Sequence, residues 1–392
     1  MSPERLARID AMCEDAIEDN IVPGIVTLIT RHGKIIHHKA FGMADQQTNR
    51  SLKKDDIFRI ASQSKAITAT AIMMLWEEGK FSLNDPISKF IPEFKNPTVL
   101  KDFRYSDTTY TTELAHREIT IRHLLTHTSG IGYGIIDGDE RFKMIYQKGG
   151  VTDLFTLEEI TIGESVKKLA KLPLHFTPGE RYAYSEGLDV LGYLVEIASG
   201  MPFDEFLATR LFEPLGMNDS YFYLPKDKHN RLVTVQKPEA EKWVKYTGTA
   251  YYDADYPIKG KQTFFSGGAG LLSTAKDYAT FLQMYLNGGE LNGTRILSRT
   301  TIQAIMGNQF PEIWEGSDWY YGLVFGVQTE YGQALGGNGN VGTFNWGGYF
   351  NTSYFADSKE GIIGIIMKQT RGQKGDYTSG RFRQLVGQAV DD

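Results

Sequence analysis

Hydrophobic residues cluster in short β-branched runs near both ends of the chain. Residues 25–38 read Ile-Val-Thr-Leu-Ile-Thr, then Arg-His-Gly-Lys, then Ile-Ile-His-His. Residues 351–367 repeat this arrangement around Asp-Ser-Lys-Glu-Gly, and residues 321–328 form a further β-rich run. Two such runs around a short glycine-containing turn predict an antiparallel hairpin. We therefore expect strands at both ends of the chain, and a closing helix from about Asp376.

The middle of the chain has the periodicity of helices instead. Apolar residues recur at helical spacing over residues 67–78, 121–125 and 185–198. Gly79 follows the first of these segments and Gly200 closes the third, as is common where a helix ends.

This order of elements predicts an α/β protein of the α+β type. We expect a largely antiparallel sheet, built from residues 1–61 and 248–392 and flanked by helices, with residues 62–247 inserted as a mainly helical lobe. The active site should lie in the cleft between the lobes. Residues 96–119 and 132–152 are polar, Gly-rich or Tyr-rich connections, long enough to form lids or cleft walls.

Composition and charge exclude several classes of protein. The 392 residues are 41% hydrophobic and 23% charged, and the net charge of -6 leaves no basic face for nucleic acid. No apolar run approaches the 18 residues or so of a membrane span. The single cysteine, Cys13, excludes an internal disulfide framework. The N-terminus carries acids where a secretory leader has an apolar core, so a cytoplasmic location is expected by default.

A serine three residues before a lysine is the most informative chemical pattern. Such residues are neighbours on a helix surface, roughly 5 to 6 Å apart at Cβ, so the amine can activate the hydroxyl. The pattern occurs at Ser51 and Lys54, Ser62 and Lys65, Ser165 and Lys168, and Ser273 and Lys276. Only Lys65 has small or apolar neighbours and no acid nearby, and burial there would favour the uncharged amine that accepts a proton. Ser62 is therefore the expected nucleophile, with helix capping as its alternative role.

Two further segments carry candidate chemistry. Within residues 176–187, Pro-Gly enforces a turn that leads to Tyr184, which could relay a proton if nearby cations lower its pKa. Packing is the alternative role, because the chain holds 21 tyrosines. Within residues 342–353, two glycines lead into a strand and could present backbone N–H groups to an oxyanion, although a β-bulge would use glycines in the same way.

Other enzyme classes lack their signatures here. His123 and His127 have the spacing of one helical face, but Leu124 stands where a His-Glu-x-x-His zinc site has its Glu. The chain contains no Gly-x-Ser-x-Gly elbow and no Gly-x-x-x-x-Gly-Lys-Ser/Thr loop. We expect neither a metal site nor a cofactor.

Taken together, the motifs resemble those of the β-lactamase-related serine hydrolases, in the same order and over nearly the whole chain. This superfamily contains class C β-lactamases, DD-peptidases and the family VIII carboxylesterases. The segments that carry the resemblance are residues 58–66, 119–130, 176–192, 211–217 and 267–271.

The resemblance implies both a fold and a mechanism. The fold would be an α/β lobe and a helical lobe around a cleft. Ser62 would attack an acyl carbonyl, and Lys65 with Tyr184 would take its proton and pass it to the leaving group. The backbone amides of Ser62 and Tyr349 would hold the oxyanion, and water would then release the acyl-enzyme.

The third motif departs from that of the antibiotic-handling members. Theirs begins with Lys or His, whose cation helps to hold the substrate carboxylate. The matching residues here are Trp346, Gly347 and Gly348, similar to the triplet of family VIII esterases. A neutral indole cannot pair with a carboxylate, so penicillin-like acids should be poor substrates.

A second departure is Glu186, where the antibiotic-handling members carry Asn. Its charge could bind an amine on the substrate or raise the pKa of the catalytic amine and phenol. Alternatively, it could point to solvent at the N-terminus of a helix, where an acid is favourable.

These observations predict a serine carboxylesterase that acts on small, largely uncharged esters with short acyl chains. The expected partner is this small-molecule ester, with no nucleic acid and no membrane. A weak β-lactamase, an amidase or peptidase, and an acyltransferase are alternatives with the same catalytic trio, and an inactive scaffold is an alternative of another class. The expected substrate-binding residues are Tyr133, Glu186, Trp346, Gly347, Gly348 and Phe350.

Overall fold

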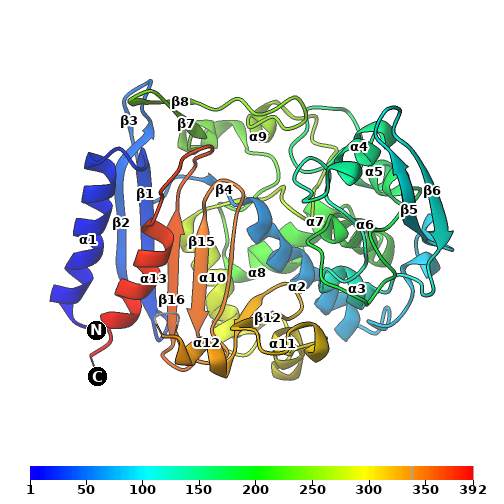
Figure 1. Cartoon of the computed structure of the whole chain (residues 1–392). Coiled ribbons are helices and arrows are strands. Elements are labelled where there is room, and N and C mark those ends of the chain that lie inside the picture. Colours follow the sequence, from blue (N-terminus) through cyan, green and yellow to red (C-terminus); the bar gives the residue numbers. More distant parts are fainter. Residues whose placement is uncertain (337–338, 392) are drawn as a thin grey trace.

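The computed structural model describes residues 1–336 and 339–391. Within these residues, eight strands form one antiparallel sheet in the order β12-β13-β14-β15-β16-β1-β2-β3 (Figure 1). Its strands are β1 (Gly24–Arg31), β2 (Lys34–Asp45), β3 (Arg50–Ser51), β12 (Trp319–Tyr321), β13 (Gly326–Gln328), β14 (Phe344–Gly347), β15 (Ser353–Asp357) and β16 (Ile362–Met367). The predicted fold class is confirmed, because strands from both ends of the chain build this sheet.

Both predicted hairpins are present. Strands β1 and β2 meet at His32 and Gly33, whose φ angles of 49° and 75° suit the tight turn of a two-residue hairpin. Strands β15 and β16 form the second hairpin, and β16 pairs with β1 through Val26 and Met367. This pairing joins the two ends of the chain in one sheet.

The remaining strands differ from the prediction. The run 321–328 is divided, because residues 322–325 turn back between β12 and β13. In addition, β14, which ends at Gly347, was not predicted, whereas the strand expected after Gly347 and Gly348 is present as β15.

Helices cover both faces of the sheet. Helices α1 (Pro3–Glu18) and α13 (Thr378–Gln388) pack on one face, where Ile9 and Phe382 enter a buried cluster with strand residues (Figure 1). Helix α10 (Ala275–Leu286) contacts β1, β15 and β16. The closing helix was therefore predicted correctly, within two residues of its start.

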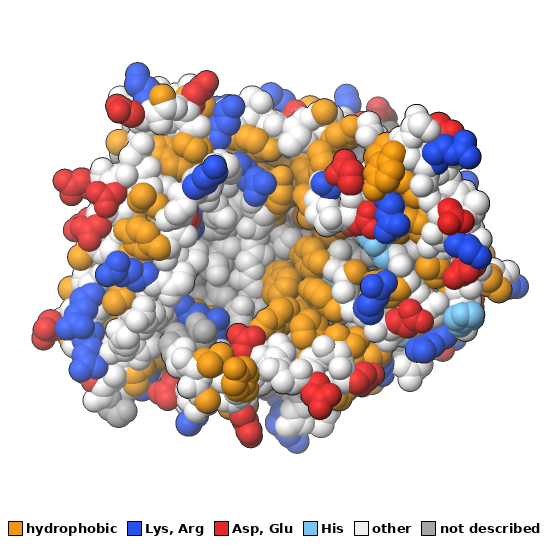
Figure 2. All heavy atoms as spheres, viewed as in Figure 1, with side chains coloured by type: hydrophobic (Ala, Val, Ile, Leu, Met, Phe, Trp, Pro, Cys, Tyr) orange, Lys and Arg blue, Asp and Glu red, His pale blue; other side chains and the backbone are white. Residues whose placement is uncertain are grey.

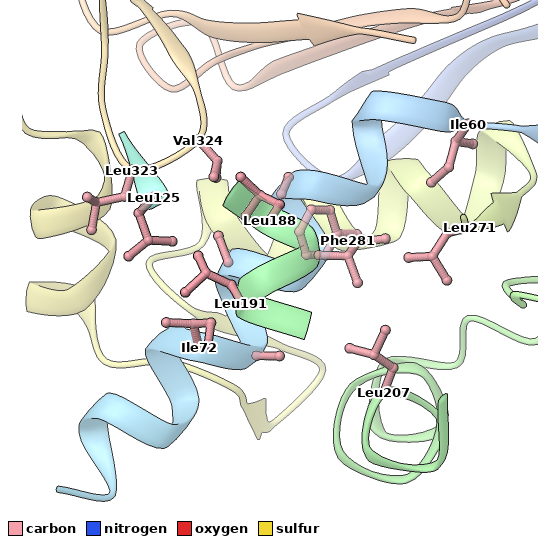
Figure 3. Close-up of a cluster of buried hydrophobic side chains, with 14 of the residues drawn as sticks. Ile60, Ile72, Leu125, Leu188, Leu191, Leu207, Leu271, Phe281, Leu323 and Val324 are labelled. Carbon is pink, nitrogen blue, oxygen red and sulfur yellow. The ribbon is translucent and has the colours of Figure 1, made fainter. Parts of the chain in front are cut away.

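Helix α2 (Ser64–Glu77) lies at the centre of the helical part. Residues 64–75 are all buried, and α2 packs closely against α6 (Gly187–Ser199). Ile72 and Leu191 belong to the core between them (Figure 3). A helix that is apolar on every side must be buried, so the position of Lys65 on α2 places a charged group in the interior.

Shorter elements complete the structure. The remaining helices are α3 (Ile121–Leu125), α4 (Glu140–Gly149), α5 (Ile162–Leu169), α7 (Phe203–Leu207), α8 (Glu213–Leu215), α9 (Tyr256–Lys259), α11 (Arg299–Met306) and α12 (Glu330–Ala334). The remaining strands are β4 (Phe58–Arg59), β5 (Thr98–Arg104), β6 (Thr109–Leu114), β7 (Gln236–Glu239), β8 (Lys242–Lys245), β9 (Leu272–Ser273), β10 (Glu290–Leu291) and β11 (Thr294–Arg295). No helix in the described residues is long and apolar enough to cross a membrane.

Two segments expected to be connections have structure of their own. Residues 96–119 contain the hairpin β5–β6, which is mostly exposed and attaches to the helical part through Leu174. Residues 132–152 contain α4. The hairpin was missed because its strands expose polar residues on both faces and so lack an apolar alternation.

A further hairpin, β7–β8, also falls within the segment predicted to be mainly helical. Thr234 N–H donates to Ala44 O, and Trp243 N–H donates to the side chain of Gln46. This segment therefore lies against β2 on the sheet side of the molecule. The division of the chain into lobes at residues 61 and 248 stays a prediction.

Candidate active site

A strained turn presents Ser62. Strand β4 pairs with β9, and the chain then enters a 3₁₀ turn over Ala61–Gln63 before α2 begins. Ala61 has a φ of 46°, in the left-handed region that residues other than glycine seldom adopt. Such strain persists only where the surroundings enforce it, which is common at active sites. Ser62 is half-buried at this turn.

Neutral oxygens surround the amine of Lys65. Its Nζ lies 3.3 Å from Ser62 Oγ, 3.1 Å from the hydroxyl of Tyr133 and 2.8 Å from the carbonyl oxygen of Gly268. The side chain is fully buried. By contrast, the lysines of the other three Ser-x-x-Lys pairs are exposed. Burial of the lysine thus distinguishes the Ser62–Lys65 pair from the other three matches.

Asp189, which the sequence analysis missed, fixes the position of the Gly268 carbonyl. Its Oδ1 accepts hydrogen bonds from Ser266 Oγ at 2.7 Å and from Gly268 N–H at 2.9 Å. Burial raises the pKa of Asp189, while these hydrogen bonds and Lys65 oppose the rise. Nothing in the local sequence singles out Asp189, since its partners lie about 80 residues away in the chain.

Tyr184 lies beside Lys65. Lys65 Nζ is 4.6 Å from the centroid of the Tyr184 ring, and this ring stacks on that of Tyr133 with centroids 5.4 Å apart. The buried hydroxyl of Tyr184 has no hydrogen-bond partner within the described residues. Burial is the main cause that raises the pKa of Tyr133 well above its usual value, so Tyr133 stays neutral.

His127 packs beneath Tyr184, with ring centroids 4.5 Å apart. Its Nδ1 is 2.9 Å from Ser185 Oγ, and burial followed by the charge of Lys65 holds its pKa well below the usual value. The imidazole is therefore neutral. The expected shared helical face of His123 and His127 is wrong, because α3 ends at Leu125 and His127 adopts a φ of 55°.

The two glycines at the end of β14 bring that strand to the serine turn. A Cβ on Gly348 would lie 2.5 Å from the carbonyl oxygen of Ile60, so only glycine permits this approach. Gly348 N–H itself donates to Thr352 O. In the described part of the chain, the amides of Ser62 and Tyr349 have no hydrogen-bond acceptor. Both N–H groups are thus available to an oxyanion.

The remaining candidate residues differ in exposure. Trp346 is half-buried, with its ring 5.8 Å from that of Tyr184. The ring of Tyr349 lies under the guanidinium of Arg371. Phe350 is only 1% exposed and packs against Phe155, so it supports the site from below and does not line its surface. Figure 2 shows a hollow near the centre of this face, with hydrophobic side chains along one side.

Glu186 does not point to solvent. It is 2% exposed, and its Oε1 accepts a hydrogen bond of 3.0 Å from Gly134 N–H. Burial raises its pKa well above the usual value, and the nearby carboxylates of Asp153 and Asp189 add to the rise. The solvent-facing alternative considered for Glu186 is therefore wrong.

Comparison with known proteins decides the family. The family model described as Beta-lactamase matches residues 9–388, nearly the whole chain. The chain belongs to the β-lactamase family. The resemblance seen in the sequence motifs is thereby confirmed.

Relatives of this β-lactamase family member include esterases. It is 30% identical to Esterase EstB of Burkholderia gladioli over 390 residues, covering 95% of this chain and 93% of that protein. It is 28% identical to the lovastatin esterase of Penicillium rubens, covering 91% of each. The solved structure of EstCE1, a hydrolase with promiscuous acyltransferase activity, matches with a TM-score of 0.80 at 25% identity and covers 98% of both chains.

Proposed function

We propose that this protein is a serine hydrolase that cleaves small carboxylic esters through an acyl-enzyme on Ser62. The observation that carries the proposal is the position of the Lys65 amine, 3.3 Å from Ser62 Oγ and surrounded by neutral oxygens. An amine without a carboxylate partner can accept the proton of an attacking hydroxyl. The esterases among its relatives support the choice of reaction.

The reaction has two steps. Ser62 Oγ bonds to the acyl carbon while its proton moves to the Lys65 amine, and the amides of Ser62 and Tyr349 stabilise the oxyanion. The carbon–oxygen bond to the alcohol then breaks, and the alcohol oxygen takes a proton through Tyr184. Water attacks the acyl-enzyme with Lys65 and Tyr184 as the base, and releases the acid and free Ser62. The unpartnered Tyr184 hydroxyl suits this relay.

The third motif favours uncharged esters as substrates. Trp346 is neutral, and Arg371, the cation beside Tyr349, already donates to Tyr349 O and covers its ring. A substrate carboxylate that loses water beside Trp346 gains no ion pair from the indole, and an unpaired buried anion is costly. The half-buried rings of Trp346 and Tyr349 offer apolar contact to small acyl and alcohol groups.

Intact-mass detection of the acyl adduct tests this proposal. The protein is exposed to a panel of p-nitrophenyl esters, amides and nitrocefin, and the adduct on Ser62 is measured with turnover. We expect adducts and turnover mainly with short-chain esters, and neither with Ser62→Ala. Undiminished turnover by Ser62→Ala, or nitrocefin turnover that rivals ester turnover, would contradict the proposal.

Acyl transfer is a second candidate, favoured by the full-length match to EstCE1, a hydrolase with promiscuous acyltransferase activity. The same acyl-enzyme would then react with an alcohol in place of water. Adding a small alcohol to the ester assay separates the two outcomes. A new ester product identifies transfer, whereas release of the acid alone identifies hydrolysis.

A further inference from the structure

Glu186 holds both sides of Tyr133. Its backbone N–H donates to Gly132 O at 3.1 Å, and its side-chain Oε1 accepts from Gly134 N–H at 3.0 Å. The residue between these two contacts is Tyr133, whose hydroxyl is 3.1 Å from Lys65 Nζ. Glu186 therefore restrains the backbone that carries one of the three oxygens around the lysine.

The same contacts bring two aromatic rings together. Tyr184 lies two residues before Glu186, and its ring stacks on that of Tyr133 at an interplanar angle of 20°. Lys65 Nζ lies 4.6 Å from one ring centroid and 5.2 Å from the other. Fixing Tyr133 against Tyr184 thus fixes the space that the amine occupies.

A second carboxyl group supports Glu186. Asp153 is hydrogen-bonded to Glu186, and its Oδ2 accepts a hydrogen bond of 3.0 Å from the hydroxyl of Tyr252. Two carboxyl groups can form such a bond only if one of them holds a proton. A Cβ on Gly134 would lie 2.3 Å from Asp153 Oδ2, so glycine is needed for this close packing.

We propose that Glu186 is a positioning residue which, with Asp153 as the partner sharing one proton, clamps Tyr133 against Tyr184 and so holds the Lys65 amine beside Ser62. The proposal rests on the function proposed above. It assigns to Glu186 a role inside the protein, in place of contact with a substrate amine. The importance of such positioning is general, since a displacement of 1 Å can cost about 100-fold in rate.

The clamp should depend on pH. Burial raises the pKa of Asp153 to about 7 and that of Glu186 well above its usual value, because two buried carboxylates cannot easily ionise side by side. Rising pH removes the shared proton, and the two anions then repel. The ionisable groups that face the pair are Tyr133, Tyr146, Asp189 and Tyr252, with Lys143 and Glu158 across an adjoining cavity of about 150 Å³.

Substitution of Glu186 tests the clamp, with Glu196 as the matched control. Glu196 lies on α6, the helix that begins directly after Glu186. It also accepts a hydrogen bond from a backbone amide, that of Phe203, and also has a pKa raised by burial. The single-turnover rate of Ser62 acylation by a p-nitrophenyl ester is measured from pH 5 to 9. Melting temperature is measured in parallel.

We expect Glu186→Ala to slow acylation about 10 to 100-fold with little change in KM. Glu186→Gln keeps an acceptor for Gly134 and a donor for Asp153, so it should restore most of the rate at pH 7 and weaken the loss of rate at alkaline pH. Glu196→Ala and Glu196→Gln should change neither the rate nor its pH profile. The double variant Tyr133→Phe/Glu186→Ala should slow acylation much less than the combined effect of the two single substitutions, because both act on the same contact.

Three results would overturn the clamp: equal rates for Glu186→Ala and Glu196→Ala, no recovery by a folded Glu186→Gln, or a Glu186→Gln pH profile that superimposes on that of the unmodified protein. A raised KM for amino-bearing esters alone would assign Glu186 to substrate binding and also overturn it. Failure of the proposed function is distinguishable, since the unmodified protein would then show neither ester turnover nor labelling of Ser62 by a fluorophosphonate.

Discussion

Two buried lysines occupy very different surroundings in this molecule. Lys65 and Lys368 are 0% and 1% exposed. Lys368 Nζ lies 2.5 Å from the carboxylate of Asp376 and also contacts Thr378 Oγ1 and Ser379 Oγ, so it ties β16 to α13. Among the described residues, the hydrogen-bond partners of Lys65 Nζ are a serine, a tyrosine and a backbone carbonyl.

The difference separates a structural lysine from one suited to chemistry. Burial lowers the pKa of Lys368, but the Asp376 carboxylate opposes this and keeps a proton on the amine. The carboxylate of Asp189, on which the charge of Lys65 acts, is hydrogen-bonded to Gly268 N–H and Ser266 Oγ instead. The partners of Lys65 therefore leave its amine able to accept a proton. In return, Lys65 lacks a carboxylate ion pair of the kind that holds Lys368 in the fold.

Exchanging each lysine for methionine should give opposite results and the largest effects. Lys65→Met removes the base and should lower kcat/KM about 10²–10⁴-fold with little loss of stability. Lys368→Met leaves the largely buried Asp376 carboxylate without its cation and should cost about 3–5 kcal/mol of unfolding free energy, while kcat/KM stays nearly constant. Ester kinetics and urea unfolding measure both. If Lys368→Met lost as much activity as Lys65→Met in the folded state, the comparison would fail.

Tyr184→Phe should have the next largest effect, because it removes the proton relay beside Lys65. We expect kcat/KM to fall about 10²–10³-fold. Stability should stay constant or rise slightly, since a buried hydroxyl without a partner is removed. Tyr182→Phe, two residues earlier, is the control and should leave activity unchanged. Equal losses in the two variants would assign the effect to packing.

Much of the fold and the burial of Lys65 could be predicted because their signals are local. The β-branched runs around Gly33 and Gly361 predict hairpins, and apolar neighbours mark Lys65 as buried. The β5–β6 hairpin has polar residues on both faces and therefore carried no such signal. Strand β14, which ends at Gly347, was also missed, and the need for glycine at position 348 depends on the distant Ile60.

The supporting residues could not be predicted for a different reason. Asp189, Asp153 and His127 act through partners about 60 to 100 residues away in the chain. Their identities become meaningful only when the fold brings those partners together. A pattern search finds residues that share a local motif, whereas tertiary packing decides which buried polar groups meet.

Trp346→Lys tests the role of charge around Lys65, because it adds a second cation near that amine. The new ammonium would repel a charge on the Lys65 amine and lower kcat/KM for neutral esters, while pairing with a carboxylate on the substrate. We expect the ratio of kcat/KM for a carboxylate-bearing ester to that for its neutral methyl ester to rise about tenfold. Trp319→Lys is the control, because the ring of Trp319 lies 6.4 Å from that of Trp346. An unchanged ratio in Trp346→Lys would show that this position does not select substrate charge.

The smallest effects should appear in the pH dependence of stability, where the surroundings of the two lysines act in opposite directions. Burial raises the pKa of Asp376, but Lys368 outweighs it and the net pKa is lowered, so this pair stabilises the fold above about pH 4 and is lost as the pH falls. The raised pKa values of Asp153 and Glu186 mean that the folded state keeps protons which the unfolded state releases, so stability falls as the pH rises from about 4 to 7.

Melting curves should therefore show Asp376→Asn converging with the unmodified protein toward pH 3, and Glu186→Gln gaining about 2 °C on it between pH 5 and 8. Parallel curves for all three proteins would mean that neither site titrates with folding, and would remove the electrostatic distinction between the surroundings of Lys368 and those of Lys65.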